Sequence, residues 1–298
     1  MTAATLLMAA PAFAQSGDAT GQGRAVITVF AKHSEMTPNI SPQDVSAKVD
    51  GKDAGVRSWT PLRDANGGLE LVVLIDGGAR NLGRQFDEIK QFIQGLRPDT
   101  KAAVGTMENG RAVLASPLSA DHARVVGEIH LPAGPSSNPY FSLSDLAQHW
   151  PSPARGVRRE VVLICDGIDP ENPRFDPSDP YVSAAIADSV RAGLVVYTIY
   201  WQHRSMGDGS NDGQSTLSEV SQATGGYGYW MGTGNPVSFT PYFDDLTRRL
   251  DNQYELDFAA RLDRKPTIES FKFKVTGMAL EVASPQQVYV DRRTGNRD

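Results

Sequence analysis

LVVLIDGGAR, residues 71–80, is the stretch that decides the fold of this chain. Five apolar residues run without a break up to Asp76, which is typical of a parallel strand that is buried on both faces. A second run, REVVLICDG at 159–167, repeats this pattern and carries Asp166 near its end. We therefore expect two buried strands that each deliver an acid to the carboxyl edge of one sheet.

Strand and helix patterns alternate around these two runs, over residues 70–250. Apolar residues recur every three or four positions across 82–96, for example, which is typical of a helix. The Asn109-Gly110 pair favours a tight hairpin, so the strand that follows it should lie antiparallel at an edge. Alternating strands and helices specify a mostly parallel sheet with helices on both faces. We predict an α/β fold with a doubly wound, mostly parallel six-stranded sheet and one antiparallel edge strand.

The sections on either side of 70–250 contain strand patterns only. Residues 24–60 include an alternating run that ends in Asp50-Gly51, which is a hairpin signal. Residues 253–290 indicate further antiparallel strands, in which apolar and charged side chains alternate. Each section is too short to bury a core alone. We therefore predict that the two pair into one small β-sandwich, into which the 70–250 domain is inserted.

Composition limits the classes of function. The 298 residues are 40% hydrophobic and carry a formal net charge of -6. A chain of this length can bury a core without disulfides, and its one cysteine, Cys165, cannot form one within the chain. An acidic balance with scattered lysines and arginines argues against a nucleic-acid partner, which needs a basic face. No stretch approaches the ~20 apolar residues of a membrane span.

The N-terminus resembles an export signal. Residues 2–14 are mostly small or apolar, and Ala12-Phe13-Ala14 fits the rule for cleavage by signal peptidase. The basic residues that usually precede such a segment are missing, so a cytoplasmic protein is the alternative. We predict a signal peptide over 1–14 and a secreted or periplasmic mature protein.

Four stretches resemble the von Willebrand factor type A domain. They are LVVLID at 71–76, VVLICDG at 161–167, AGLVVYTIYW at 192–201 and ATGGYGYW at 223–230. Over about residues 24–290 the chain is similar to secreted bacterial proteins of that superfamily, in which β-rich sections flank the domain. The resemblance implies an α/β domain with a metal-ion-dependent adhesion site at the carboxyl edge of its sheet.

The first part of that site departs from the family pattern. The family has D-x-S-x-S, whereas this chain has Asp76, Gly78 and Arg80 at the three positions. Gly78 supplies no hydroxyl, and Arg80 supplies a cation. Adjacent buried carboxylates repel unless a cation or a proton lies between them. We therefore weigh an Arg80–Asp76 ion pair in place of the metal against an Arg80 side chain that points to water.

The remaining family ligands are a threonine in a later loop and an aspartate that acts through water. The loop corresponds to GPSSNPYFSL at 134–143, where Ser137 and Asn138 are the candidates, and the aspartate corresponds to Asp166. The predicted site is thus degenerate and has little affinity for a metal. Its residues are Asp76, Gly78, Arg80, Asn138 and Asp166.

A second candidate metal site is a calcium loop. Asp208, Ser210, Asp212 and Glu219 match the spacing D-x-S-x-D-G-x5-E, which aims side-chain oxygens at one ion. However, a strand pattern precedes this stretch, whereas an EF-hand needs a helix there. A polar loop rich in glycine, aspartate, asparagine and serine is the alternative interpretation.

Tyr140 and Phe141 are the candidate partner-binding loop. Aromatic side chains together with arginine anchor many protein interfaces, and the sequence contains no H-E-x-x-H, G-x-S-x-G or phosphate-loop motif. We predict a non-enzymatic module, without a cofactor, that binds a protein or an extracellular surface. The alternatives are adhesion through Mg²⁺ at Asp76 and Asp166, a secreted hydrolase that uses the same crevice, and a scaffold subunit of an envelope assembly.

Overall fold

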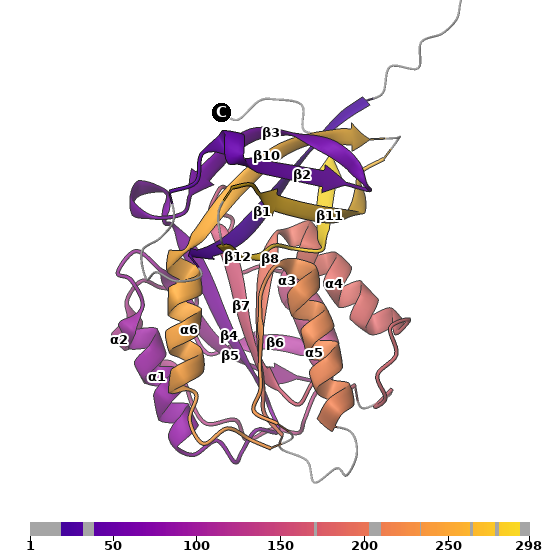
Figure 1. Cartoon of the computed structure of the whole chain (residues 1–298). Helices are drawn as coiled ribbons and strands as arrows, with labels where there is room; N and C mark the ends of the chain where they lie inside the picture. The colour runs from indigo at the N-terminus through magenta and orange to yellow at the C-terminus, as the bar shows by residue number, and fades with distance from the viewer. Residues whose placement is uncertain are drawn as a thin grey trace, which may run out of the picture.

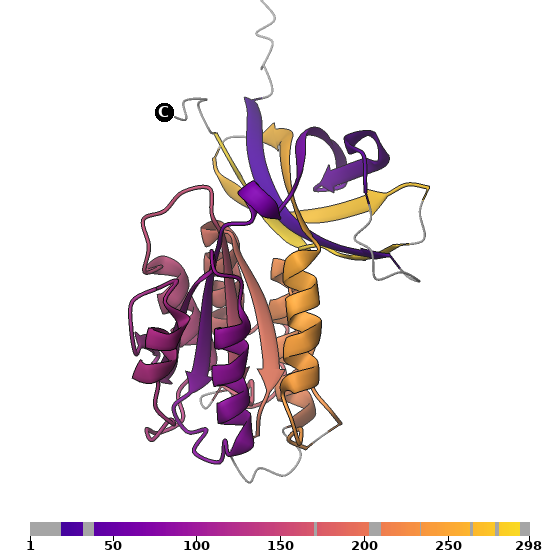
Figure 2. The same cartoon turned by 90° about the vertical axis from the view of Figure 1, so that its left-hand side faces the viewer.

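Two β-structures stacked end to end make up the chain (Figure 1). The computed structural model describes residues 19–31, 39–169, 172–202, 210–232, 234–262, 265–277 and 280–292. Strands from both ends of the chain form a barrel, and the residues between them form a mixed sheet covered by helices (Figure 2). The predicted signal peptide, 1–14, lies outside the described residues.

Six antiparallel strands close the barrel. β1 (Ala19–Ala31) pairs with β10 (Gln253–Leu262) along one edge and with β13 (Gln287–Asp291) along the other. Three more strands complete the ring in the order β10-β3-β2-β11-β13, and β12 lies outside it, beside the end of β1. Their bounds are β2 (Val45–Val49), β3 (Lys52–Pro61), β11 (Thr267–Val275) and β12 (Leu280–Ala283), with a 3-10 turn at Pro42–Asp44.

Two glycines of β1 explain why these strands can close. A Cβ at Gly23 would lie 2.4 Å from Cζ of Phe258, and one at Gly21 would lie 2.5 Å from Cγ1 of Val290. A side chain at either position would push the barrel walls apart, so glycine permits the close approach. The register of β10 against β3 also shifts after Asp257, and such bulges bend a strand.

The fold class predicted from the sequence is wrong. The chain is not a doubly wound parallel α/β protein with a small β-sandwich, because eight of its twelve described strand pairings are antiparallel. The flanking sections form a closed barrel, in which each of the six strands is paired on both edges. Alternation along a strand predicts one buried face, but it does not tell whether the sheet closes.

The middle of the chain forms a six-stranded mixed sheet. β4 (Leu69–Asp76) lies between β5 and β7 and is parallel to both. β8 and β9 follow in parallel beyond β7, whereas β6 is antiparallel to β5 at the other edge. Every residue of β4 is buried. The other bounds are β5 (Lys101–Glu108), β6 (Arg111–Leu114), β7 (Arg158–Cys165), β8 (Leu194–Tyr200) and β9 (Gly228–Tyr229).

Helices cover both faces of this sheet (Figures 1 and 2). α1 (Arg84–Gly95), α2 (His122–Glu128) and α6 (Thr240–Asp251) pack on one face. α3 (Pro139–Gln148), α4 (Pro180–Ala192) and α5 (Ser210–Thr224) pack on the other. The chain leaves β4 towards the first face and β7 towards the second, so the carboxyl ends of these two strands flank a place where α/β sheets bind ligands. Within the described residues, no helix is both long and apolar enough to cross a membrane.

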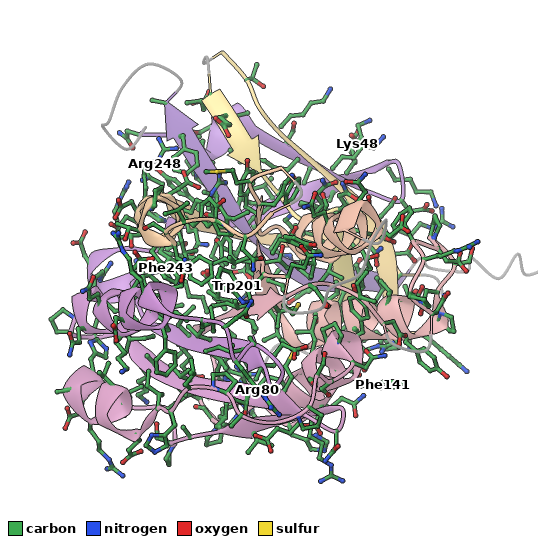
Figure 3. The ribbon with its side chains drawn as sticks, turned by 90° about the horizontal axis from the view of Figure 1, so that it is seen from below. Lys48, Arg80, Phe141, Trp201, Phe243 and Arg248 are labelled. Carbon is green, nitrogen blue, oxygen red and sulfur yellow. The ribbon has the colours of Figure 1, made fainter. Side chains whose placement is uncertain are left out.

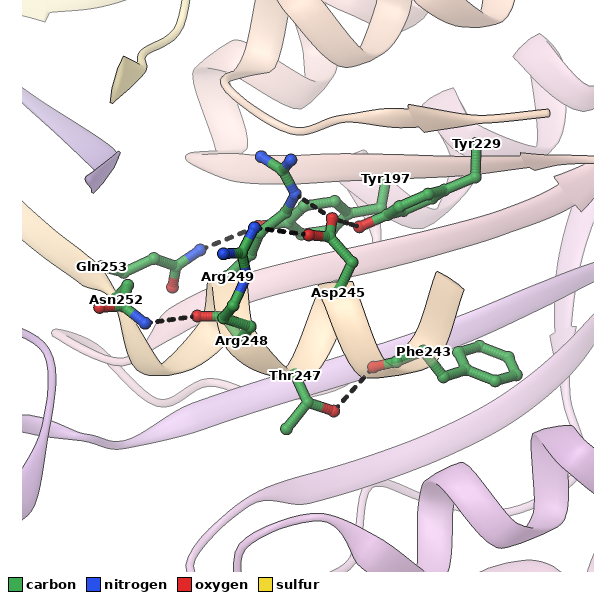
Figure 4. A network of polar contacts seen from close by, with 9 residues as sticks. All are labelled: Tyr197, Tyr229, Phe243, Asp245, Thr247, Arg248, Arg249, Asn252 and Gln253. Carbon is green, nitrogen blue, oxygen red and sulfur yellow. Dashed lines mark hydrogen bonds and ion pairs between the residues drawn. The ribbon is translucent and has the colours of Figure 1, made fainter. Parts of the chain in front are cut away.

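A buried polar network joins the amino end of the mixed sheet to the barrel (Figure 4). Gln253 begins β10 of the barrel, and its Nε2 donates to the hydroxyl of Tyr197 on β8, at 3.0 Å. Arg158 at the start of β7 donates to the Gln253 side chain as well. Near by on α6, Nε of Arg249 donates to Asp245 at 2.6 Å. These bonds fix the end of the sheet that faces the barrel, and they leave the carboxyl end open.

Candidate functional site

Asp76 lies at the carboxyl end of β4, and hydrogen bonds from neighbouring loops hold its carboxylate. It is fully buried, and its Oδ1 accepts a hydrogen bond from the backbone N–H of Gly78 at 2.6 Å. Its Oδ2 accepts one from the hydroxyl of Ser136 at 3.1 Å. A Cβ at Gly77 would lie 2.7 Å from the carbonyl oxygens of both Met107 and Pro135, so this tight loop requires glycine.

Asp166 follows the neighbouring strand, β7, and lies close to Asp76. Ile75 of β4 lies opposite Ile164 of β7, which brings the two strand ends side by side. Burial, and then the negative charges of Asp166 and Asp76, raise the pKa of the Cys165 thiol. Both carboxylates therefore act on the same buried residue, whose thiol stays protonated and is not a reactive nucleophile.

Arg80 contacts the loop opposite Asp76. Its side chain is exposed, and its Nη2 donates to the carbonyl oxygen of Gly134 at 3.0 Å. The same loop supplies the Ser136 hydroxyl that Asp76 accepts. Arg80 and Ser136 thus tie two loops together, and the Arg80–Asp76 ion pair stays a prediction.

Ser137 and Asn138, the two candidates for the third family ligand, have structural roles in this loop. Oδ1 of Asn138 accepts hydrogen bonds from the backbone N–H groups of Tyr140 and Phe141, at 2.9 and 3.2 Å. This is an N-cap of α3, and it occupies the oxygen that a metal would need. The hydroxyl of Ser137 accepts from the N–H of Gly110 at 2.8 Å.

Ser136 is the residue that sequence reasoning missed. Three polar residues follow one another at 136–138, and nothing in the sequence tells which of them points to Asp76. Among the described residues, no three side chains of His, Cys, Asp or Glu come together as a metal site. Asp76, Ser136 and Asp166 alone would offer an ion only three protein side chains, of which Asp76 already accepts two hydrogen bonds.

Tyr140 and Phe141 do not lie in a loop, as we predicted for partner binding, but in a helix. Both lie in the first turn of α3, and Tyr140 is 1% exposed, with its hydroxyl donating to the carbonyl oxygen of Gly167 at 2.5 Å. The prediction for Tyr140 as a contact residue is wrong, because Asn138 caps a helix that turns this ring into the core. Phe141 is 39% exposed and packs edge-to-face on Tyr181 of α4, at 4.7 Å between ring centroids.

Arg80, Phe141 and Tyr181 together form what we call the strand-end face. Figure 3 views the molecule from below and labels Arg80 and Phe141. Trp201, also labelled there, is buried and donates from Nε1 to Oδ1 of Asn81 at 2.8 Å. Nδ2 of Asn81 in turn donates to the carbonyl oxygen of Gln202. Asn81 therefore ties the Asp76 loop to the end of β8, and no sequence motif had pointed to it.

The predicted calcium loop falls on a helix. α5 begins at Ser210 and contains Asp212 and Glu219, while Asp208 lies outside the described residues. Asp212 and Glu219 are seven positions apart on the helix, which separates them by about 10 Å along its axis, so the two carboxylates cannot wrap around one ion as a calcium loop does. Asp212 and Glu219 therefore lie on a helix and not in a loop, and calcium binding at this stretch stays a prediction.

Comparison with known proteins gives only distant structural likenesses. No family model and no curated protein matches the chain. Similar solved structures include an aerotolerance-related membrane protein from Bacteroides fragilis, at 15% identity and a TM-score of 0.44, over 62% of this chain and 99% of that one. The vWF domain of a type V pili tip protein from Porphyromonas gingivalis is 11% identical, with a TM-score of 0.41, over 61% of this chain and 94% of that one. A pilus adhesin from Lactobacillus rhamnosus is 9% identical, with a TM-score of 0.45, over 90% of this chain and 52% of that one. These values are too low to carry an argument, and the family resemblance stays a prediction.

Proposed function

We propose that this chain is an exported, non-enzymatic binding module that recognises a protein through the strand-end face, without a metal ion. The observation that carries the proposal is the setting of Asp76. Both of its carboxylate oxygens accept hydrogen bonds from the protein, from Gly78 and from Ser136, at the position where a metal-dependent adhesion site would place its ion. These two hydrogen bonds stabilise the carboxylate and hold the loops around it, which supports recognition through a preformed face.

The exposed side chains around Asp76 have the chemistry of an interface. Phe141 and Tyr181 form an aromatic pair that is partly open to solvent, and Arg80 adds an exposed guanidinium. Aromatic and arginine side chains are enriched among the residues that dominate binding energy in protein complexes. The strand-end face also lies at the carboxyl ends of the strands, where sheets of this kind bind ligands.

The proposal is tested by cross-linking in cells that produce the protein. A photoreactive benzoylphenylalanine replaces Phe141 in one variant and Val282 of β12 in another. Both positions are similarly exposed, but Val282 lies on β12, which pairs with β1 beside the barrel. We expect a discrete protein adduct from position 141, none from position 282, and the same adduct yield in EDTA. Adding Arg80→Glu to the position 141 variant should reduce the yield.

Two results would contradict the proposal. An adduct at position 141 that disappears in EDTA would indicate metal-dependent adhesion. Adducts from position 282 alone would assign the interface to the barrel, as expected for a scaffold subunit.

A further inference from the structure

A groove of about 560 Å³ lies along α5. Phe175, from the loop before α4, and Trp230, just after β9, contribute its two aromatic side chains. α5 contributes polar side chains, among them Glu219 and Gln222. None of Arg80, Phe141 and Tyr181 lines the groove, so it is a separate feature of the surface.

The two aromatic rings of the groove are exposed although they are large and apolar. Phe175 is 38% and Trp230 is 41% exposed. A Cβ at Gly228 would lie 2.6 Å from Cζ3 of Trp230, so the indole lies directly against the backbone of β9. A large ring that the backbone supports on one side is a preformed contact surface for a ligand.

Among the described residues that line the groove, Glu219 has the one ionisable side chain. Its Oε2 is buried and has no hydrogen-bond partner among the described residues. Burial, and then the negative charge of Asp179, raise the pKa of this carboxyl. A buried acceptor without a donor is costly to the folded protein, and a ligand that supplies a donor recovers that cost.

The neutral polar groups of the groove are already engaged with one another. Nε2 of Gln286 donates to Oε1 of Gln222 at 3.1 Å, and Nε2 of Gln222 donates to Ser218 at 2.8 Å. Nε2 of Gln214 donates to the carbonyl oxygen of Gly232 at 2.7 Å. These bonds use part of the hydrogen-bonding capacity of the glutamine side chains, whereas Oε2 of Glu219 has no hydrogen-bond partner among the described residues. The group that lacks a donor is thus an acid, and two aromatic side chains line the same groove.

We propose that this groove binds an arginine side chain on an extended segment of a partner protein, with its guanidinium at Glu219 and its stem against Trp230 and Phe175. A guanidinium pairs with a carboxylate through charge-assisted hydrogen bonds and stacks on aromatic faces. The negative charge of Asp179 adds to the attraction, because it acts on the same place as Glu219. This site goes beyond the proposed function, since none of the three residues of the strand-end face lines the groove.

The test uses nuclear magnetic resonance of the full isotope-labelled chain. The probes are three: the peptide acetyl-Gly-Arg-Gly-amide, its neutral counterpart with Gln in place of Arg, and maltotriose. We expect the arginine peptide to shift the signals of the Trp230 indole and the Gln222 side chain in a saturable way, and the other two probes to leave them unchanged. Glu219→Gln should weaken binding about tenfold, since a lost charge-assisted bond of about 1.4 kcal/mol corresponds to that factor.

Control variants separate the groove from general charge effects. Glu281→Gln removes the same charge from an exposed position on β12 and should leave binding unchanged. Phe175→Ser changes an exposed loop residue, which the fold should tolerate, and should weaken binding. Equal binding of the glutamine peptide, or an unaltered affinity in Glu219→Gln, would overturn the proposal. Shifts caused by maltotriose alone would reassign the groove to a saccharide.

Discussion

The two ends of the mixed sheet carry acids in opposite settings. At the amino end, Glu160 of β7 is fully buried beside Arg158, and Arg158 donates to Gln253 at the start of β10 of the barrel. At the carboxyl end, Asp76 is equally buried, but short loops hold it, and exposed side chains such as Arg80 lie above it. The difference teaches that one end joins two parts of the fold, while the other is free to meet a partner.

The largest effect on stability is expected from removing the Arg158 contacts at the amino end of the mixed sheet. Arg158 is 5% exposed and donates to the carbonyl oxygen of Leu250 at 2.7 Å and to the side chain of Gln253. Arg158→Met would leave these two acceptors without this donor and would remove the cation that lies 4.0 Å from the Glu160 carboxylate. We expect a loss of about 3–5 kcal/mol in the free energy of unfolding, measured in urea.

The matched control is Arg57→Met, which removes an exposed guanidinium from β3 of the barrel. It should change stability by no more than about 0.5 kcal/mol. A loss below about 1 kcal/mol in Arg158→Met would mean that the junction does not depend on this side chain.

Local sequence was enough to predict the two buried strands and the hairpin turn of the mixed sheet. Asp76 and Asp166 end continuous apolar runs, and such runs can only be buried strands in a sheet covered on both sides. The Asn109-Gly110 turn has positive φ at both residues, which is the conformation that this pair favours in a hairpin. These features depend on local sequence, so local reasoning can find them.

Barrel closure and the loop contacts depend on residues far apart in the chain. Gly23 matters only because Phe258 packs against it, more than two hundred residues later. Ser136 meets Asp76 only because the fold brings two loops together. The burial of Tyr140, by contrast, could have been foreseen, since Asn138-Pro139 is a recognisable helix start.

A smaller effect is expected from the pH dependence of the amino end. Burial raises the pKa of Glu160 from 4.5 to about 7, although the Arg158 guanidinium opposes the shift. The folded state therefore holds this proton more tightly than the unfolded chain does. The stabilisation from the protonated carboxyl is complete below pH 4.5 and is lost as the pH rises through about 7.

Glu160→Gln mimics the protonated carboxyl at every pH. At pH 8 we expect this variant to be more stable than the wild-type protein by up to about 3 kcal/mol, and at pH 4 the two should be alike. Urea unfolding across this range measures the difference, with Glu281→Gln on exposed β12 as the control. Parallel stability curves for wild type and Glu160→Gln would show that Glu160 does not titrate in this way.

The smallest effect is expected at the carboxyl end, where added ions should not change the thermal midpoint. An ion bound at a hundred times its dissociation constant would add about 2.7 kcal/mol, which thermal unfolding in Mg²⁺, Mn²⁺, Ca²⁺ or EDTA would detect. We expect no shift, because Gly78 and Ser136 already donate to Asp76 and Asn138 caps α3. The double variant Gly78→Ser, Arg80→Ser restores the two missing hydroxyls, and a response to Mg²⁺ in this variant alone would trace the loss of the ion to positions 78 and 80. A wild-type midpoint that rises in Mg²⁺, and no longer does so in Asp76→Ala, would instead make the two ends alike in needing a cation: a guanidinium at one and a metal at the other.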